Sequence, residues 1–354
     1  MTDSDRLIET LDARARRRDS RRAFFTGVIG AAAGAAALSG TAQAQTTPAP
    51  SPSPSPSPSP SPSGTPTPTF TEADVLNFAL NLEYLEANYY AFAVTGSPLA
   101  SADISGQIGT AGSATGGRAV GFKDSVVQQY ANEIYQDELA HVRFLRAQFT
   151  DASRLAQPRI DLGTDPSGAF STAAVAAGLI TQGQSFDPYA SDENFLLGAY
   201  LFEDVGVTAY KGAAPALLTS KLYLEAAAGI LAVEAYHAAI VRSVLYRKGI
   251  ATPALGLIQA TTAISDARDR LDGRPTEDTT RGIAPDDDQG IAPDTTNPNA
   301  PVSNIMPLNA NGLAYSRSPG QVLNIVYLNA GAVSSGGFFP AGVNGNIKTS
   351  AASA

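Results

Sequence analysis

Two short stretches, Glu138-Leu139-Ala140-His141 and Glu234-Ala235-Tyr236-His237, decide the fold predicted for this chain. The chain contains two histidines, and each follows a glutamate by three residues. Residues three apart lie on one face of an α-helix, so each Glu-x-x-His pair can direct a carboxylate and an imidazole at one point. Two such helices, with one inward glutamate from each of two others, form the dinuclear metal site of one class of four-helix bundle. The pattern therefore predicts two further helices of this kind.

Apolar residues at helical spacing supply both halves of such a bundle. The first helix is expected to begin at Thr71, because Thr71-Glu72-Ala73-Asp74 is a capping-box variant ahead of an apolar stripe that contains Glu83. The second helix, about 122–149, places Glu138 and His141 on its apolar face and Asp137 away from it. Each helix thus brings acidic residues into an otherwise apolar stripe.

The second half repeats this order. A third helix is expected from about Ser191 or Asp192, with Glu203 on its apolar face, and a fourth over about 219–248, with Gly249 as its C-cap. A fifth helix, about 253–271, packs on the outside or on the partner chain of a possible homodimer. Residues 151–191 form a crossover connection, with one short helix near 173–180, and 321–328 is expected to be a short strand.

A weak internal repeat selects between candidate residues. Tyr90 follows Glu83 by seven residues, and Tyr210 follows Glu203 by the same interval. The repeat favours Glu83 over Glu86, one turn further on, as the inward carboxylate of the first helix. Tyr90, Tyr210 and Glu86 are candidates for groups that contact the metal ligands; the alternative for the two tyrosines is a place in the aromatic core.

Four buried carboxylates without partners would destabilise a domain by several kcal/mol each, so their charge must be compensated. Two divalent cations match four carboxylates in formal charge. Oxygen and imidazole donors with open positions suit Fe or Mn, and Zn is a possible substitute. We expect Glu138 and Glu234 to bridge two ions, and Glu83 and Glu203 to be terminal. The predicted ligands are Glu83, Glu138, His141, Glu203, Glu234 and His237.

Residues 70 to about 271 resemble the ferritin-like domain family, and within it the exported bacterial proteins related to plant desiccation-related proteins. The resemblance rests on the segments 82–86 (Leu-Glu-Tyr-Leu-Glu) and 202–210 (Phe-Glu-Asp-Val-Gly-Val-Thr-Ala-Tyr), both Glu-x-x-His pairs, and more loosely the segment 336–342. It implies an all-α, ferritin-like four-helix bundle with a long crossover between the second and third helices and an irregular C-terminal tail. A histidine in both pairs departs from cage-forming ferritins and is closer to bacterioferritin, rubrerythrin-like and manganese catalase sites.

The N-terminal region has the features of a targeting segment. Ser20-Arg21-Arg22-Ala23-Phe24-Phe25 resembles a twin-arginine signal and precedes an apolar run and a small-residue site ending at Ala44. We expect a signal peptide at 1–44, a Pro/Ser/Thr-rich linker at 45–69, the bundle at 70–272 and a mostly irregular extension at 273–354. The mature chain is then periplasmic or extracellular, with no stable membrane span.

Composition excludes several functions. The chain of 354 residues has no cysteine, which rules out disulfides and thiolate sites. Its formal net charge of −9, without a basic cluster, argues against nucleic acid as a partner. The predicted function is redox chemistry on O₂, peroxide or Fe(II), ferroxidase-like or catalase-like, in stress protection. The alternative is a non-catalytic desiccation-related or stress-related protein that binds metal for structure or sequestration.

Overall fold

The computed structural model describes residues 70–217, 219–273, 288–296, 299–309 and 311–352. The chain divides into two units, Met1–Thr65 and Pro66–Ala354, and every described residue belongs to the second. The predicted signal peptide and linker lie outside the described residues.

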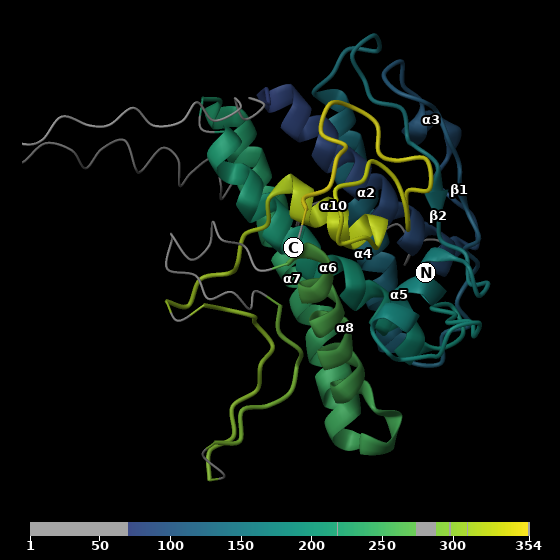
Figure 1. Cartoon of the computed structure of the whole chain (residues 1–354), viewed down its shortest axis with the longest axis vertical. Coiled ribbons are helices and arrows are strands. Elements are labelled where there is room, and N and C mark those ends of the chain that lie inside the picture. The colour runs from purple at the N-terminus through teal and green to yellow at the C-terminus, as the bar shows by residue number, and fades with distance from the viewer. Residues whose placement is uncertain (1–69, 218, 274–287, 297–298, 310, 353–354) are drawn as a thin grey trace, which may run out of the picture. The chain divides into compact units, whose positions relative to one another are not determined.

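Four long helices form the predicted all-α bundle (Figure 1). They are α2 (Glu72–Thr95), α4 (Ser125–Ala147), α6 (Asp192–Ala213) and α7 (Lys221–Ala251). Helix α2 packs most extensively against α4, and α6 against α7, so the bundle is built from two helix pairs, as the internal repeat predicts.

Side-chain caps fix where the bundle helices begin. The Thr71 hydroxyl accepts a hydrogen bond from the amide of Asp74 (3.2 Å), and the Asp74 carboxylate accepts one from the amide of Thr71 (2.8 Å), which completes the predicted capping box. The side chains of Asp124 and Ser191 cap α4 and α6 by accepting hydrogen bonds from backbone amides of the first turn. Such caps each stabilise a helix by about 1 kcal/mol, and they set the register in which the acidic residues face inward.

The connections between the bundle helices carry small elements of their own. The loop after α2 contains α3 (Ser101–Ile104) and β1 (Ala114–Thr115), and the crossover from α4 to α6 contains β2 (Ile160–Asp161) and α5 (Ala169–Ala176). β1 and β2 pair in parallel, Ala114 opposite Ile160. The crossover is therefore tied to the first helix pair rather than loose.

Helix α7 is longer than expected, and the prediction of Gly249 as its C-cap is wrong. The helix continues to Ala251, and Thr252 is the cap. Gly249 is buried inside the helix, where a Cβ would lie 3.0 Å from the Ile258 side chain. The glycine allows close approach of α8 (Leu257–Asp272) to α7. Within the described residues, α7 alone is long and apolar enough to cross a membrane, a property that core helices of globular proteins share.

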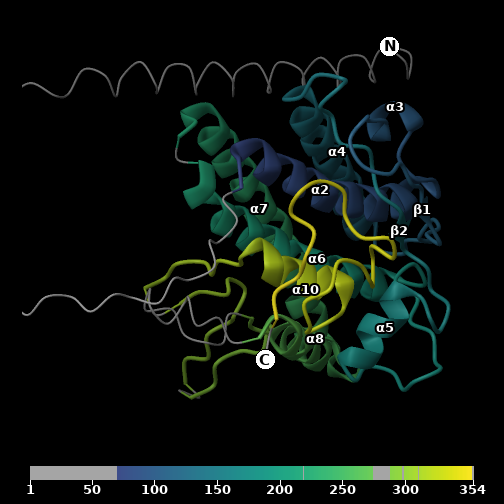
Figure 2. The same cartoon turned by 45° about the horizontal axis from the view of Figure 1, so that its top comes forward.

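The C-terminal extension returns to the bundle. The expected strand at 321–328 is wrong: these residues form helix α10 (Pro319–Tyr327), which starts with a Ser318–Gln321 capping box. A short apolar run fits either a strand or a buried helix, and here the cap decides. Helix α10 packs against α6 and α8, and it lies between α2 and α8 in the view of Figure 2.

Buried ion pairs anchor this extension. Arg317 pairs with Asp272 at 2.7 Å, and both Arg317 and Arg268 contact the carboxylate of Asp288. Arg268 also pairs with Asp204 of α6 at 3.0 Å. Because breaking a buried pair leaves an unpaired charge, each partner holds the extension on the bundle beside the helix that carries Glu203.

Candidate metal centre

The six predicted ligands meet in the middle of the bundle. Helix α2 contributes Glu83 and α6 contributes Glu203, while α4 and α7 each contribute one Glu-x-x-His pair. The side chains come from all four bundle helices and are almost completely buried; His141 is the most exposed, at 8%. This buried set comprises Glu83, Glu138, His141, Glu203, Glu234 and His237.

The six residues divide into two groups of four that share two members. One group contains Glu83 and His141, the other Glu203 and His237, and both contain Glu138 and Glu234. Within each group the potential ligand atoms lie within 4.8 Å of one another. This is the arrangement required when two carboxylates bridge two ions and each ion has one further carboxylate and one imidazole.

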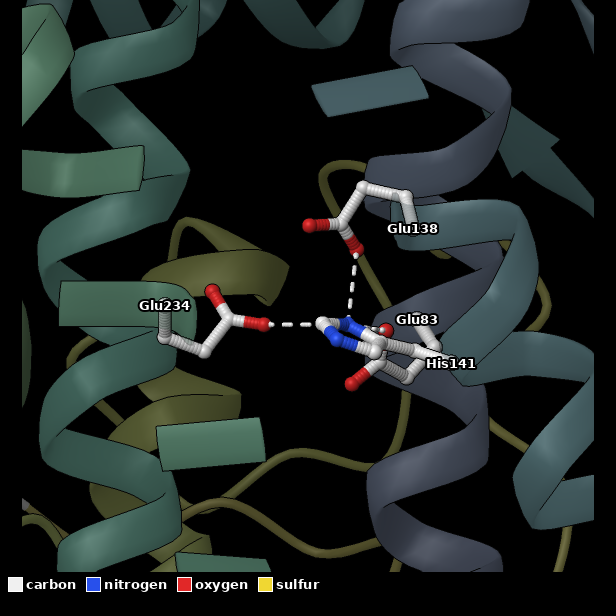
Figure 3. Close-up of side chains that lie close together, drawn as sticks. All are labelled: Glu83, Glu138, His141 and Glu234. Carbon is white, nitrogen blue, oxygen red and sulfur yellow. Dashed lines mark ion pairs between the residues drawn. The ribbon is translucent and has the colours of Figure 1, made fainter. Parts of the chain in front are cut away.

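Both imidazoles present Nδ1 to the carboxylates. Nδ1 of His141 lies 3.3 Å from Glu83 Oε2, 3.6 Å from Glu234 Oε1 and 3.8 Å from Glu138 Oε2 (Figure 3). Nδ1 of His237 lies 3.0 Å from Glu138 Oε1 and 3.7 Å from Glu203 Oε2. Among the described residues, none of these atoms has a hydrogen-bond partner with correct geometry. These oxygen and nitrogen atoms therefore converge on common positions, as the ligands of a metal ion do, without forming hydrogen bonds with one another.

Unpaired buried polar atoms of this kind are rare, because each costs the free energy of its lost hydration. The centre holds eight of them, and all belong to the predicted ligands. Two divalent cations would satisfy these atoms and match the formal charge of the four carboxylates. The mixed oxygen and nitrogen donors fit Fe or Mn, which prefer such sets with open positions. The residues present therefore fit a dinuclear centre.

Two tyrosines each hold one of the two carboxylates predicted to be terminal, Glu83 and Glu203, by a hydrogen bond between α2 and α6. The Tyr90 hydroxyl on α2 donates to Glu203 Oε1 on α6, and the Tyr210 hydroxyl on α6 donates to Glu83 Oε1 on α2. In each glutamate, Oε2 remains without a partner among the described residues and faces the centre. Both tyrosines thus pack in the core and also orient a predicted ligand, so the two roles weighed from the sequence are compatible.

Glu86 lies beside the centre but in neither group of four. It is 6% exposed, and Gly206 on α6 brings it near Glu234: a Cβ at position 206 would lie 2.6 Å from Glu234 Oε2 and 3.4 Å from Glu86 Oε1. Burial, reinforced by the charges of Glu138 and Glu203, raises the pKa of Glu86 well above its usual value. The structure thus places Glu83, not Glu86, with His141.

Asp137 is a residue of the centre that the helical pattern missed. Its carboxylate lies at the half-exposed edge of α4, yet Oδ2 is 3.4 Å from Nε2 of His237 on α7. A carboxylate on the second nitrogen of an imidazole fixes the tautomer and makes the other nitrogen a better ligand. The signal in the sequence is the acid directly before Glu138; Val233 occupies the matching position before Glu234. Within the described residues His141 has no such carboxylate on Nε2, so the two imidazoles are not equivalent.

In the absence of cations the centre retains protons. Burial raises the pKa of Glu83 to about 7 and that of Glu203 to about 8. Burial opposes charge on the imidazoles, but Glu83 and Glu138 raise the pKa of His141 to about 11, and Asp137 and Glu138 raise that of His237 to about 10. Burial also disfavours ionisation of Glu138, yet its two imidazole neighbours bring its pKa below the usual range. Cations binding here must displace these protons.

The bundle and its carboxylate–histidine centre define the class of protein. The ferritin-like domain family matches residues 71–247, which cover α2, α4, α6 and all but the last four residues of α7, and the chain belongs to this family.

Two proteins of known name align with most of the chain. Ferritin-like catalase Nec2 of Nesocodon mauritianus is 28% identical over 282 residues, 78% of this chain and 84% of Nec2. Desiccation-related protein PCC13-62 of Craterostigma plantagineum is 28% identical over 273 residues, 76% of this chain and 82% of that protein. No solved structure matches the chain. Both alignments are longer than the matched domain, so they extend beyond the four-helix bundle.

Proposed function

We propose that this protein binds two Fe or Mn ions at the centre and uses them to disproportionate hydrogen peroxide. The observation that carries the proposal is the set of unpaired, buried Glu and His atoms arranged in two groups that share Glu138 and Glu234. The similarity to a protein named ferritin-like catalase supports the choice of peroxide as substrate.

A bound pair of such ions supplies reversible one-electron changes, so that two electrons from one peroxide, which leaves as O₂ and two protons, reduce a second peroxide and two protons to two waters. The residues of the chain set the conditions for this reaction. Tyr90 and Tyr210 hold Glu203 and Glu83 with Oε2 directed inward. Asp137 holds the ring of His237. Burial of all the ligands keeps bulk water from the reacting atoms.

The proposal is tested with the full chain, purified without chelator, by following O₂ release from hydrogen peroxide. Glu234→Gln removes one shared carboxylate while keeping the shape of the side chain, and turnover is expected to fall to background. Glu225→Gln, an exposed glutamate on the same helix, serves as the matched control and should retain wild-type turnover. Equal rates in wild type and Glu234→Gln would overturn the proposal.

A second candidate is a metal-binding protein without turnover, and the similarity to the desiccation-related protein favours it. In that case the cations mainly stabilise the bundle by compensating buried charge. Thermal melting with and without chelator, beside the peroxide assay, separates the two candidates. A large fall in melting temperature on chelation without peroxide turnover would support the second.

Ferroxidase activity is the variant of the first candidate in which Fe(II) is a substrate. It uses the same ligands, so the assay decides: oxidation of Fe(II) added beyond two equivalents per chain, with no O₂ release from peroxide, would favour it.

We also propose that the protein acts outside the cytoplasm. The twin-arginine pattern at Ser20–Phe25 supports export to the periplasm or beyond. Sequencing of the mature N-terminus should find a chain that begins at Gln45; an intact Met1 on all the protein would contradict export with cleavage.

A further inference from the structure

Two apolar cavities lie next to each other along α6. The outer cavity is lined by α5, α6, α8 and the end of α10, including Ala173, Leu197, Leu201, Ile264 and Leu328. The inner cavity lies between α2, α6 and α10, and its lining includes Leu85, Glu86, Leu201, Gly206, Tyr210 and Ile325. Leu201 is the one residue that both linings share, so the two cavities approach each other at its side chain.

The inner cavity is separated from the metal centre by residues that touch the predicted ligands. Tyr210 in its wall donates to Glu83, and Gly206 in its wall packs against Glu234, since a Cβ at position 206 would lie 2.6 Å from Glu234 Oε2. Leu197 lies one helical turn before Leu201 on α6 and lines the outer cavity. The two cavities thus follow one another along α6, from the α5–α8 side of the bundle to the residues Gly206 and Tyr210 beside Glu234 and Glu83.

The linings define what can use this route. The outer cavity has Arg268 as its one charged lining residue, and the Arg268 guanidinium is bound by Asp204 and Asp288. The inner cavity has Glu86 and Tyr210 as polar groups among otherwise apolar lining residues. A bare cation would lose its hydration in such surroundings at a cost of many kcal/mol, whereas a small neutral molecule would not. The Glu86 carboxyl group can accept a hydrogen bond from a hydroperoxide.

We propose that the two cavities are the access route for a neutral peroxide and that Leu201 controls passage between them. The inference deepens the proposed function and rests on it for the identity of the substrate. It also implies that cations reach the centre by another path. We expect a small motion of the Leu201 side chain to admit hydrogen peroxide but not a bulky alkyl hydroperoxide.

The route is tested by changing the size of residue 201 in the full-length, metal-loaded protein. Rates are measured with hydrogen peroxide and with tert-butyl hydroperoxide as oxidants and ascorbate as the two-electron donor, which becomes dehydroascorbate while the peroxide gives two waters, or tert-butanol and one water. Leu201→Ala should raise kcat/KM for the bulky substrate relative to hydrogen peroxide by about tenfold. Leu201→Phe should lower kcat/KM for hydrogen peroxide with unchanged metal content.

Leu196→Ala is the matched control. Leu196 is a buried leucine of the same helix and lies in neither of the two linings. Its truncation should therefore leave unchanged the ratio of kcat/KM for tert-butyl hydroperoxide to kcat/KM for hydrogen peroxide. A ratio that is the same in wild type and both Leu201 variants, or that changes as much in Leu196→Ala, would overturn the route.

A second readout does not depend on turnover. The chain has no tryptophan, so Phe202→Trp places a single fluorophore in the lining of the inner cavity. Quenching of this tryptophan by dissolved O₂ should increase with Leu201→Ala and decrease with Leu201→Phe, while iodide should quench poorly in all three. If wild type shows no peroxide turnover but quenching follows residue 201, the proposed function fails and the route stands. If turnover is present and neither readout responds to residue 201, the route fails alone.

Discussion

Tyr210 on α6 donates its hydroxyl hydrogen to Glu83 on α2, on the opposite helix of the bundle. The reciprocal bond from Tyr90 on α2 to Glu203 on α6 makes the two halves of the centre equivalent in this respect. Each bond occupies one oxygen of a glutamate and leaves the other directed at the centre. The tyrosines thereby limit each outer carboxylate to one orientation before any cation binds.

Replacing either tyrosine with phenylalanine is expected to weaken metal binding by about tenfold, as with other groups that orient a metal ligand. The hydroxyl is removed, the ring remains, and the carboxylate regains rotational freedom. Competition with a chelator of known affinity measures the loss. Tyr189→Phe is the control, because the buried Tyr189 hydroxyl has no partner among the described residues. Equal affinities in all three variants would contradict the orienting role.

Asp137→Asn should affect one of the two ions more than the other. The carboxylate contacts Nε2 of His237, and His141 has no matching contact among the described residues. We expect stoichiometry near one ion per chain at cation concentrations that fill both sites of wild type, measured by titration calorimetry. Glu133→Gln, an exposed acid on the same helix, should bind as wild type does. Uniform weakening of both sites by Asp137→Asn would count against inequivalent imidazoles.

Gly206→Ala is expected to remove metal without unfolding the chain. The added Cβ would lie 2.6 Å from Glu234 Oε2, so the shared carboxylate must move. Gly229→Ala on α7 provides the comparison: no atom lies within 4 Å of its Cβ position. That change should retain the metal and stabilise the helix by about 1 kcal/mol. Full metal content in Gly206→Ala would show that Glu234 can be displaced without consequence.

Stability should depend on pH differently with and without cations. Glu83 and Glu203 have folded-state pKa values raised to about 7 and about 8, so in the metal-free protein they bind more protons folded than unfolded. Their contribution to the free energy of unfolding is present at low pH and is lost as pH rises from about 4.5 to 8. The folded-state pKa values of His141 and His237 are raised to about 11 and about 10. Their contribution to the free energy of unfolding is therefore lost from about pH 6.5 upward.

The melting temperature of the chelated protein is therefore expected to fall between about pH 5 and pH 8, while bound cations compensate the same charges in the loaded protein. The difference between the two melting temperatures should widen with pH over this range. Differential scanning calorimetry at several pH values measures it. A constant difference would mean that these groups do not exchange protons for cations.

Much of the centre could be predicted because its acidic residues stand on helix faces that are otherwise apolar, where charged residues are unusual. Glu83 and Glu203 stand in apolar helical stripes, and the two Glu-x-x-His pairs contain both histidines of the chain. The start of α2 was equally accessible, since the Thr71 capping box is a local interaction. Such features depend on residues three or four apart.

The features that escaped prediction depend on distant partners. Asp137 sits on the polar edge of α4, and its role requires the position of His237 on another helix. Gly249 has the sequence features of a helix C-cap, and its role in letting α8 pack closely on α7 is visible only in the folded chain. The pairs of Arg317 with Asp272 and Asp288 follow from how the extension returns to the bundle, for which the sequence offers no local signal. Helix α10 does have a local signal, the Ser318–Gln321 capping box, which the strand prediction did not take into account.

The central claim is that six buried side chains hold two redox-active ions. Its most direct test is elemental mass spectrometry of the full chain, purified without chelator or added metal, beside the Glu234→Gln variant. We predict close to two Fe or Mn ions per chain in the wild type and a clear loss in the variant. No transition metal in the wild type, or equal content in both proteins, would contradict the claim.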